Sequence, residues 1–361
     1  MGVSMYRTPE LSVIMPVRNE IAHIGSVLDQ LLDQSLAPER FEVIVVDGMS
    51  TDGTRALVHD YGRRDPRVRL LDNPRYLAGS ARNIGVRNAR APHVIFVDGH
   101  CRIASERMLE TALEAFGRGE RCLSRPQPLY GDATNVYSTA VSLVRGTRLG
   151  HHAGSRIFSD KDQHCSPVSA GCAYTRELYL EVGGTDEDFD AGEDLELNYR
   201  VKQLGVSAFH CHGLTVAYCA RSSVAALFRQ LYRYGFGRAR LARKHTEAAS
   251  MPAVGLGFAM LGFLVLPALG VAWVPAWRLW LVGIALYLLV VGSVSARLAG
   301  KHGWHLFGPL LLCFPAIHAG AGLGFLAGLT GGPSWTHAPK LRSAQVLMWT
   351  CLLPGSETSC F

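Results

Sequence analysis

Five acidic residues stand where a catalytic site is easily built, after short apolar runs or at the start of a helical segment. Asp47 and Asp98 each end an apolar run, and Asp52 follows Asp47 in DGMSTDGT. Glu193 and Asp194 stand together in AGEDLELNYR. Carboxylates bind hard cations such as Mg²⁺ and Mn²⁺, and a free carboxylate can take a proton from a weakly acidic hydroxyl. These acids therefore indicate metal-assisted group transfer with a general base. The sheet region has no GxGxxG or GxxxxGK[ST] motif, so usual dinucleotide or P-loop signatures are absent.

The elements that must position these acids alternate along the first third of the chain. Short β-branched runs predict buried strands at 11–17, 41–47, 67–72 and 92–98. Helical stretches are expected between and after them, at about 20–34, 52–64, 79–90 and 104–117. This alternation predicts a parallel sheet covered by helices on both faces. Ligands bind such sheets beyond the carboxyl ends of the strands, where the acids cluster.

The next hundred residues have a looser pattern that ends in a basic amphipathic segment. A helix is expected at 193–204 and strands at about 206–211 and 214–219. Segment 222–245 alternates apolar residues with basic ones, namely Arg229, Arg233, Arg238, Arg240, Arg243 and Lys244. Such a segment should lie at a membrane surface and contact anionic lipid. Nucleic-acid binding is disfavoured, because the domain before residue 246 is nearly neutral.

The last part of the chain predicts membrane crossings. No Asp or Glu occurs between Glu247 and Glu357, and apolar segments at about 253–275, 277–297 and 306–330 can each span a hydrocarbon core. The preceding basic cluster places that end in the cytoplasm. Three crossings would leave the tail outside, although the tight turn at 275–278 leaves a re-entrant pair open. Glycines spaced by four in the last segment would let another helix approach closely, namely Gly320, Gly324 and Gly328.

These features predict a cytoplasmic α/β domain at 1–245, whose residues 222–245 form an interfacial helix. A transmembrane region at 246–332 and a short tail at 333–361 follow. The N-terminus lacks an apolar core of signal-peptide length, which also favours a cytoplasmic catalytic domain. We therefore expect a multi-pass protein of the cell membrane with its catalytic domain in the cytoplasm.

Six motifs in order resemble the family-2 glycosyltransferases with a GT-A fold. They are SVIMPVRNE at 12–20, VVDGMSTDGT at 45–54, AGSARNIGVRNA at 78–89, IFVDGH at 95–100, GEDLELNYR at 192–200 and RQLYRYG at 229–235. The resemblance covers about residues 10–245. Together with the C-terminal apolar segments, these motifs make the chain most similar to the bacterial exopolysaccharide enzymes of the succinoglycan type. It implies a GT-A, Rossmann-like nucleotide-diphospho-sugar transferase domain.

The resemblance implies a role for each matching residue. Pro16, Val17 and Glu20 would line the nucleotide site, with Asp47 and Glu20 contacting uracil or ribose. Arg82 would contact the diphosphate or ribose, and Asp98 would hold Mn²⁺ or Mg²⁺. Asp194 would be the general base, with Glu193 beside it at the acceptor side. The Q-x-x-R-W motif, with tyrosine in place of tryptophan, would close over acceptor or diphosphate through Gln230, Arg233 and Tyr234.

One residue departs from the family pattern. The second metal-motif aspartate is His100 in this chain. Histidine is a softer ligand that suits Mn²⁺ better than Mg²⁺, so His100 either binds the metal or contacts the phosphate without it.

Structural roles compete with functional ones at four further places. Asp52 fits the cap of its helix as well as a ligand contact, and Glu193 could be only a helix-start acid. The pair His210 and His212 is more simply explained by an edge strand than by a metal site, and His318 either touches a lipid-linked acceptor or hydrogen-bonds within the helix bundle.

The resulting hypothesis is an inverting, metal-dependent glycosyltransferase. It would move a sugar from a nucleotide sugar, with UDP as the expected nucleotide, to a polyprenyl-linked saccharide at the membrane. A processive polysaccharide synthase is the first alternative, since the Q-x-x-R-W motif often accompanies polymerisation. A non-catalytic membrane scaffold is the second alternative, and the His100 departure is the feature that favours it.

Overall fold

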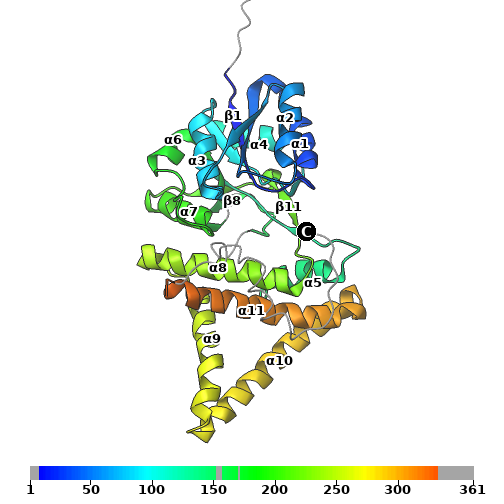
Figure 1. Ribbon diagram of the computed structural model, residues 1–361, viewed down its shortest axis with the longest axis vertical. Coiled ribbons are helices and arrows are strands. Elements are labelled where there is room, and N and C mark those ends of the chain that lie inside the picture. The colour runs from blue at the N-terminus through cyan, green and yellow to red at the C-terminus, as the bar shows by residue number, and fades with distance from the viewer. Residues whose placement is uncertain (1–7, 152–156, 170, 332–361) are drawn as a thin grey trace, which may run out of the picture.

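The computed structural model describes residues 8–151, 157–169 and 171–331. An α/β unit contains strands β1 to β11, and a group of long helices lies against one side of it (Figure 1). The predicted order of a soluble-type domain followed by apolar helices is thus present.

An eight-stranded sheet forms the centre of the α/β unit, in the order β3-β2-β1-β4-β9-β6-β10-β8. Its first half is parallel and contains β3 (Val68–Asp72), β2 (Phe41–Asp47), β1 (Leu11–Val17) and β4 (His93–Phe96). These strands match the four predicted runs, and their register sets Val17 opposite Asp47. The acids that follow β2 and β4 therefore share one edge of the sheet.

The second half of the sheet is mixed, so the expectation of a parallel sheet is wrong there. The strands involved are β6 (Cys122–Ser124), β8 (Gln163–Cys165), β9 (Gly171–Thr175) and β10 (Ala208–His210). β9 runs antiparallel to both β4 and β6, and β8 runs antiparallel to β10. β9 inserts between strands that precede it in the chain, and no local pattern of side chains announces such a long-range pairing.

A second, three-stranded sheet lies beside the first and contains β5 (Cys101–Ile103), β11 (Val216–Cys219) and β7 (Leu129–Tyr130). β5 follows directly after Asp98 and His100, and β11 pairs with it antiparallel so that Tyr218 lies opposite Cys101. This small sheet therefore brings residues more than a hundred positions later in the chain to the end of β4.

Helices cover both faces of the large sheet. One face packs against α1 (Ile24–Leu32), α2 (Thr54–Arg64) and α4 (Met108–Gly117). The other packs against α3 (Ala78–Asn88), α6 (Arg176–Glu181) and α7 (Glu193–Gln203). The alternation of β1 explains both layers, since Val13 and Met15 are buried in the first core and Ile14 in the second.

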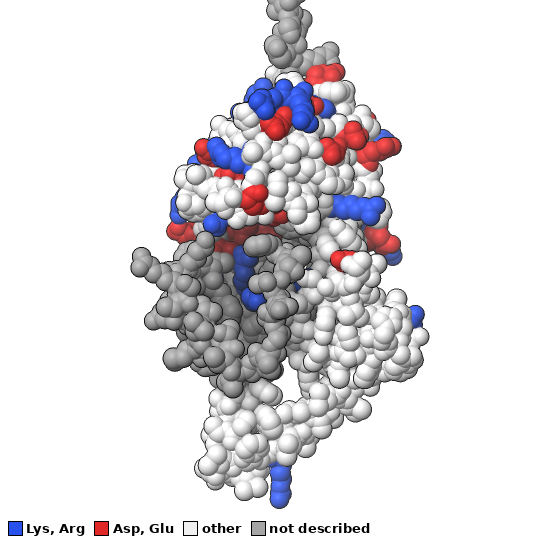
Figure 2. All heavy atoms as spheres, turned by 45° about the vertical axis from the view of Figure 1, so that its right-hand side comes forward, with Lys and Arg blue, Asp and Glu red and all other residues white. Residues whose placement is uncertain are grey.

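The remaining helices are α5 (Val136–Arg145), α8 (Val224–Lys244), α9 (Met251–Gly270), α10 (Val274–His302) and α11 (Phe307–Leu329). Short 3-10 helices are η1 (Pro38–Arg40), η2 (Pro167–Ser169), η3 (His212–Leu214), η4 (Thr246–Ala248) and η5 (Trp304–Leu306). Three candidate spans, Met251–Gly270, Val274–His302 and Trp304–Leu329, are long and apolar enough to cross a membrane. Their group presents an almost uncharged surface, in contrast to the mixed charges of the α/β unit (Figure 2).

The three long apolar helices have different orientations. α11 runs alongside α8, whereas α9 and α10 extend away from the α/β unit and meet at a tip (Figure 1). Exposed Trp273 and partly exposed Trp277 lie at that tip, beside Arg278. Tryptophan and arginine favour the border between hydrocarbon and water.

The predicted close helix approach is present, and its partner is α8. A Cβ added to Gly324 would lie 2.0 Å from the Tyr232 carbonyl oxygen, and one added to Gly320 would lie 2.7 Å from that of Phe228. The two helix backbones are therefore in direct contact, which only glycine permits at these positions.

Candidate active site

Asp98 lies at the edge of the sheet beyond β4 and is held by a residue of the small sheet. The Tyr218 hydroxyl donates a 2.7 Å hydrogen bond to Asp98 Oδ2. Burial would raise the pKa of Asp98, but the Arg82 guanidinium and His100 outweigh burial and hold the pKa below its usual range. Asp98 is therefore an oriented, ionised carboxylate.

His100 is oriented by another residue expected at the nucleotide site. Its Nδ1 lies 2.8 Å from Glu20 Oε1, and this contact fixes the imidazole ring and leaves Nε2 for a further partner. A carboxylate behind a histidine is the usual support for a metal-binding imidazole. The structure thus joins Glu20, Asp98 and His100 in one cluster.

The donor set around Asp98 fits a divalent cation that is shared with a substrate. Among the residues that the structure describes, no group of three or more His, Cys, Asp and Glu side chains could hold a metal alone. Mg²⁺ is commonly held by one or two protein ligands together with substrate phosphates. Asp98 and His100 provide such a pair, and the histidine tilts the preference toward Mn²⁺.

Arg82 faces this cluster from α3 and links it to α7. Its Nη1 donates a 2.6 Å hydrogen bond to Glu193 Oε1, and both side chains are 13% exposed. Burial alone would lower the pKa of Arg82, but the Glu193 and Asp194 carboxylates outweigh it and raise the pKa. Arg82 Nε is buried without a hydrogen-bond partner among the described residues, so the guanidinium retains a donor. Glu193 therefore orients Arg82 as well as starting a helix.

Asp194 is exposed in the first turn of α7. Gly192 precedes the helix with a φ of 78°, a left-handed conformation that favours glycine. Among the described residues, the Asp194 side chain accepts a single, local hydrogen bond, from the backbone of Leu195 to Oδ1 at 2.8 Å. This carboxylate is therefore available to take a proton.

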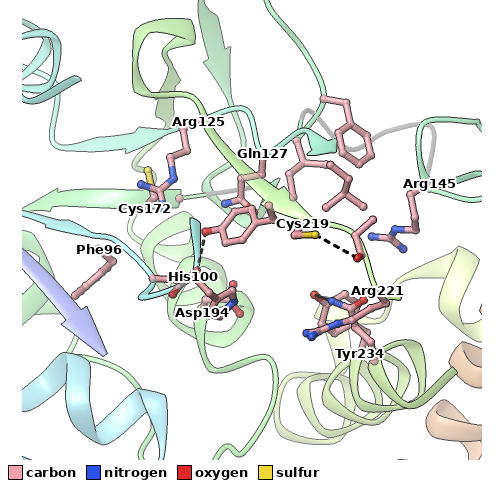
Figure 3. Close-up of a pocket in the computed structure, with 18 of the residues that line it drawn as sticks. Phe96, His100, Arg125, Gln127, Arg145, Cys172, Asp194, Cys219, Arg221 and Tyr234 are labelled. Atoms are coloured by element: carbon pink, nitrogen blue, oxygen red, sulfur yellow. Dashed lines mark hydrogen bonds between the residues drawn. The ribbon is translucent and has the colours of Figure 1, made fainter. Parts of the chain in front are cut away.

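A cavity of about 270 Å³ connects these residues. Its lining includes Arg82, Asp98, His100, Asp194, Gln230 and Tyr234. Figure 3 shows Asp194 and His100 on one side of this space and Tyr234 with Arg145 and Arg221 on the other. Residues from four of the six motifs thus line one cavity, from the sheet edge after β4, α3, α7 and α8.

Two residues of the Gln230, Arg233 and Tyr234 motif line the cavity, and the third does not. Gln230 Nε2 donates a 3.2 Å hydrogen bond to the Tyr234 hydroxyl, and both residues line the cavity. Arg233 instead donates a 3.0 Å hydrogen bond to the Asp190 carbonyl, in the segment that leads into α7. Its closest role in the structure is to support the segment before Asp194.

Asp47 and Asp52 have partners of their own outside this cavity. The fully buried Asp47 carboxylate accepts hydrogen bonds from Ser50 Oγ at 2.5 Å and from Arg55 Nη1 at 3.3 Å. Asp52 accepts from the Thr54 backbone at 3.0 Å and from that of Ile21 at 3.1 Å, so it ties the start of α2 to the segment after β1. Pro16 and Val17 lie at the end of β1, on the same sheet edge. The role of these residues toward a nucleotide stays a prediction.

The cavity also contains arginines that the sequence reasoning missed. They are Arg125 after β6, Arg145 at the end of α5 and Arg221 after β11. Arg125 is only 3% exposed, and its Nε and Nη1 have no hydrogen-bond partner among the described residues. Its one visible signal in the sequence is a lone cation in a short apolar stretch, CLSRP.

The histidines with two open interpretations are hydrogen-bonded. His318 contacts the Tyr287 hydroxyl at 2.9 Å and the Leu149 carbonyl at 2.9 Å, so it links α10, α11 and the segment after α5. His210 contacts Ser124 Oγ at 2.8 Å and the Ser159 carbonyl at 3.0 Å. The structure supports a structural role for both, but the expectation of an edge strand is wrong, because β10 lies between β6 and β8 and His212 lies in η3.

Comparison with known proteins agrees with this geometry. The model of the Glycosyl transferase family 2 matches residues 12–182. The chain is 29% identical over 235 residues to the succinoglycan biosynthesis protein ExoA of Rhizobium meliloti, a match that covers 64% of this chain and 70% of that protein.

Two further similarities cover more of the chain. A dolichyl N-acetyl-alpha-D-glucosaminyl phosphate 3-beta-D-2,3-diacetamido-2,3-dideoxy-beta-D-glucuronosyltransferase of Methanococcus voltae is 22% identical over 336 residues, covering 90% of this chain and 98% of that protein. The mannosyltransferase PcManGT from Pyrobaculum calidifontis, solved in complex with GDP-Man and Mn²⁺, superposes with a TM-score of 0.55 at 19% identity and covers 87% of each chain.

The structural match shows a common fold, and the sequence matches show relatedness to glycosyltransferases. Together they confirm the predicted GT-A fold and the use of a nucleotide-sugar donor in glycan biosynthesis. The chain belongs to glycosyltransferase family 2.

Proposed function

We propose that this chain is an inverting, divalent-metal-dependent glycosyltransferase that moves a hexose from a UDP-sugar to a lipid-linked saccharide. The observation that carries the proposal is the position of Asp98 and Asp194 on one cavity. Asp98 lies at the sheet edge where nucleotides bind in such sheets, and Asp194 is exposed at the start of α7.

The chemistry follows from these two positions. A hydroxyl of the acceptor would give its proton to Asp194 while its oxygen attacks the anomeric carbon of the donor. The bond between that carbon and the diphosphate oxygen breaks on the opposite side, so the configuration inverts. Arg82 and Arg125 would receive the negative charge of the departing diphosphate. A divalent cation bound by Asp98 and His100 would supply further charge neutralisation.

The metal proposal is supported by the chemistry of the Asp98–His100 pair and by the Mn²⁺ in the Pyrobaculum calidifontis mannosyltransferase complex. We propose Mn²⁺ or Mg²⁺ for this chain.

A membrane-bound acceptor is supported by the surroundings of the cavity. Gln230 and Tyr234 line it from α8, and α8 packs along the apolar α11. The Methanococcus voltae relative carries a dolichyl-linked sugar phosphate in its name. We propose a bacterial inner-membrane location with the catalytic domain in the cytoplasm, which the basic residues of α8 support.

A donor screen tests the proposal. The full-length protein in detergent is mixed with a panel of UDP- and GDP-sugars, with and without Mn²⁺, and nucleotide release is measured. Metal-dependent release of UDP from one sugar is expected. Metal-independent release would contradict the metal proposal. Silence across the panel, with a folded protein and a lipid-linked saccharide present, would favour a non-catalytic scaffold.

The length of the product separates single addition from processive synthesis. α9 and α10 meet at their tip and separate toward α11 (Figure 1), and their side chains are largely exposed. These two helices therefore do not enclose a channel. We expect one sugar per acceptor, and a ladder of products would support the synthase.

A further inference from the structure

A second cavity, of about 530 Å³, leads from the active site toward the apolar helices. It shares six lining residues with the first cavity, namely Gln127, Arg145, Ile157, Gly171, Asp194 and Tyr234. Asp98 and His100 line the first cavity and are not among the described residues that line the second. Asp194 therefore lies between a side with the metal-binding pair and a side that faces the membrane helices.

The second cavity contains arginines whose charge the described residues leave unbalanced. Arg145 from α5 and Arg238 from α8 are both partly buried and line it together with Arg148. Neither Arg145 nor Arg238 forms an ion pair or a hydrogen bond with any residue that the structure describes. Four other basic residues of α8 show the contrast, since Arg233, Arg240, Arg243 and Lys244 each donate hydrogen bonds to the protein.

The electrostatics of this arginine pair are unfavourable without a bound anion. Burial lowers the pKa of Arg145, Tyr234 opposes this only in part, and the charge of Arg238 lowers the pKa further. Burial also lowers the pKa of Arg238, and the Asp194 carboxylate opposes this only in part. Two like charges held close together away from water cost free energy unless a counter-ion offsets them. An anion with several acceptor oxygens would satisfy both guanidinium groups.

The same cavity also has an apolar part of its lining. Leu256 from α9 and Ile317 and Ala321 from α11 contribute to it. His318 holds Leu149 next to this lining through the hydrogen bond to its carbonyl oxygen. A ligand in this place must combine an anionic group with a hydrocarbon chain.

We propose that Arg145 and Arg238 bind the phosphate or diphosphate of the lipid-linked acceptor, with its hydrocarbon chain leaving between α9 and α11. This inference rests on the proposed function and locates the acceptor side of the same site. The saccharide would then extend from the arginines toward Asp194. The donor diphosphate has its own cations at the other end, Arg82 and Arg125, which do not line the second cavity.

The test measures lipid binding without any donor. Radiolabelled undecaprenyl diphosphate is titrated onto the full-length protein in neutral detergent, with undecaprenol, inorganic diphosphate and UDP as competitors. Undecaprenyl diphosphate should bind, undecaprenol and UDP should not compete, and inorganic diphosphate should compete only weakly. Arg145→Gln and Arg238→Gln should each weaken lipid binding about ten-fold or more, the usual effect of losing a hydrogen bond to a charged group.

Arg64→Gln is the control, because Arg64 is an exposed arginine at the end of α2 that lines neither cavity. It should leave lipid binding unchanged. Because neither cavity arginine supports a partner within the described chain, both glutamine variants should keep or raise the thermal midpoint. A lowered midpoint in both would indicate structural arginines and overturn the proposal.

The remaining outcomes separate the possible sources of the anion. If UDP competes and the glutamine variants lose UDP binding, the arginines serve the donor and the proposal is wrong. If inorganic diphosphate competes as well as the lipid, the apolar lining contributes nothing and the lipid assignment fails. Failure of the proposed function itself would appear elsewhere, as absence of UDP release in the donor screen with lipid binding intact.

Discussion

Glu196 should hold the catalytic helix in place, and Glu196→Gln tests this. Its carboxylate is fully buried two residues after Asp194. It accepts hydrogen bonds from Arg200 Nη2 at 2.6 Å and from Lys244 Nζ at 2.7 Å, and it contacts His245 Nε2 at 3.0 Å. Glu196 thereby ties α7 to the end of α8.

The size of the effect follows from the pKa of this carboxyl group. Burial would raise the pKa of Glu196, but the bonds from Arg200, Lys244 and His245 outweigh it and lower the pKa from 4.5 to about 2. A difference of that size corresponds to about 3 kcal/mol of stability. For a domain of this size, about 3 kcal/mol lowers the thermal midpoint by about 6–12 °C.

The pH dependence gives a second check. Because the folded pKa is depressed, the carboxylate stabilises the fold fully above about pH 4.5 and loses this contribution as the pH falls toward 2. The gap in thermal midpoint between wild type and Glu196→Gln should therefore be constant near neutrality and shrink below pH 4.5.

Thermal unfolding of the full-length protein in detergent, followed by circular dichroism, measures both effects. Glu177→Gln serves as control, since Glu177 is an exposed acid in the first turn of α6 and should change stability by less than about 0.5 kcal/mol. Equal midpoints for Glu196→Gln and Glu177→Gln at pH 7 would refute the reasoning, as would a gap that widens in acid.

Two further predictions concern the long helices. Gly324→Ala should destabilise the contact between α8 and α11 by about 1–3 kcal/mol, because its Cβ would lie 2.0 Å from the Tyr232 carbonyl oxygen, whereas Gly308→Ala meets nothing within 4 Å and should be neutral in the same unfolding assay. The end of α11 should lie on the side of the catalytic domain, because α11 runs along α8 while α9 and α10 extend away (Figure 1). A fluorescent protein fused after Gly331 should therefore fluoresce and alkaline phosphatase at the same point should be inactive; an active phosphatase would support a third crossing.

The parts of the fold that were predictable have strong local patterns. The runs 11–17 and 41–47 match β1 and β2 to the residue, because continuous β-branched sequence leaves little alternative to a buried strand. β9 was not predicted, since its position between β4 and β6 depends on contacts with residues distant in sequence. The orientation of α11 was equally hidden, because its apolar composition suits a helix that crosses a membrane and one that lies beneath α8.

The candidate site also contains residues that the sequence predicted and residues that it did not. Asp98 and Asp194 could be located because they stand in motifs whose residue types announce their chemistry. The Arg82–Glu193 ion pair joins residues 111 positions apart, so its geometry had no signal in the sequence. Arg145 was missed because a single arginine at the end of an apolar helix normally points to solvent, and only the packing of α5 against α11 places it beside Arg238. The i, i+3, i+4 spacing of Gln230, Arg233 and Tyr234 predicts one shared face of α8, but it could not show that Arg233 donates a hydrogen bond to the distant Asp190 carbonyl.

The most direct test of the central claim compares the Asp194→Asn and Asp98→Ala variants. Both are assayed with the donor sugar that the screen identifies. Isothermal titration of that UDP-sugar with Mn²⁺ gives donor binding, and transfer to a lipid-linked saccharide gives activity. The account predicts that Asp194→Asn binds the donor nearly as wild type does but transfers no sugar, and that Asp98→Ala loses Mn²⁺-dependent donor binding. Donor binding lost in Asp194→Asn, or transfer retained in it, would contradict the assignment of Asp194 as the base.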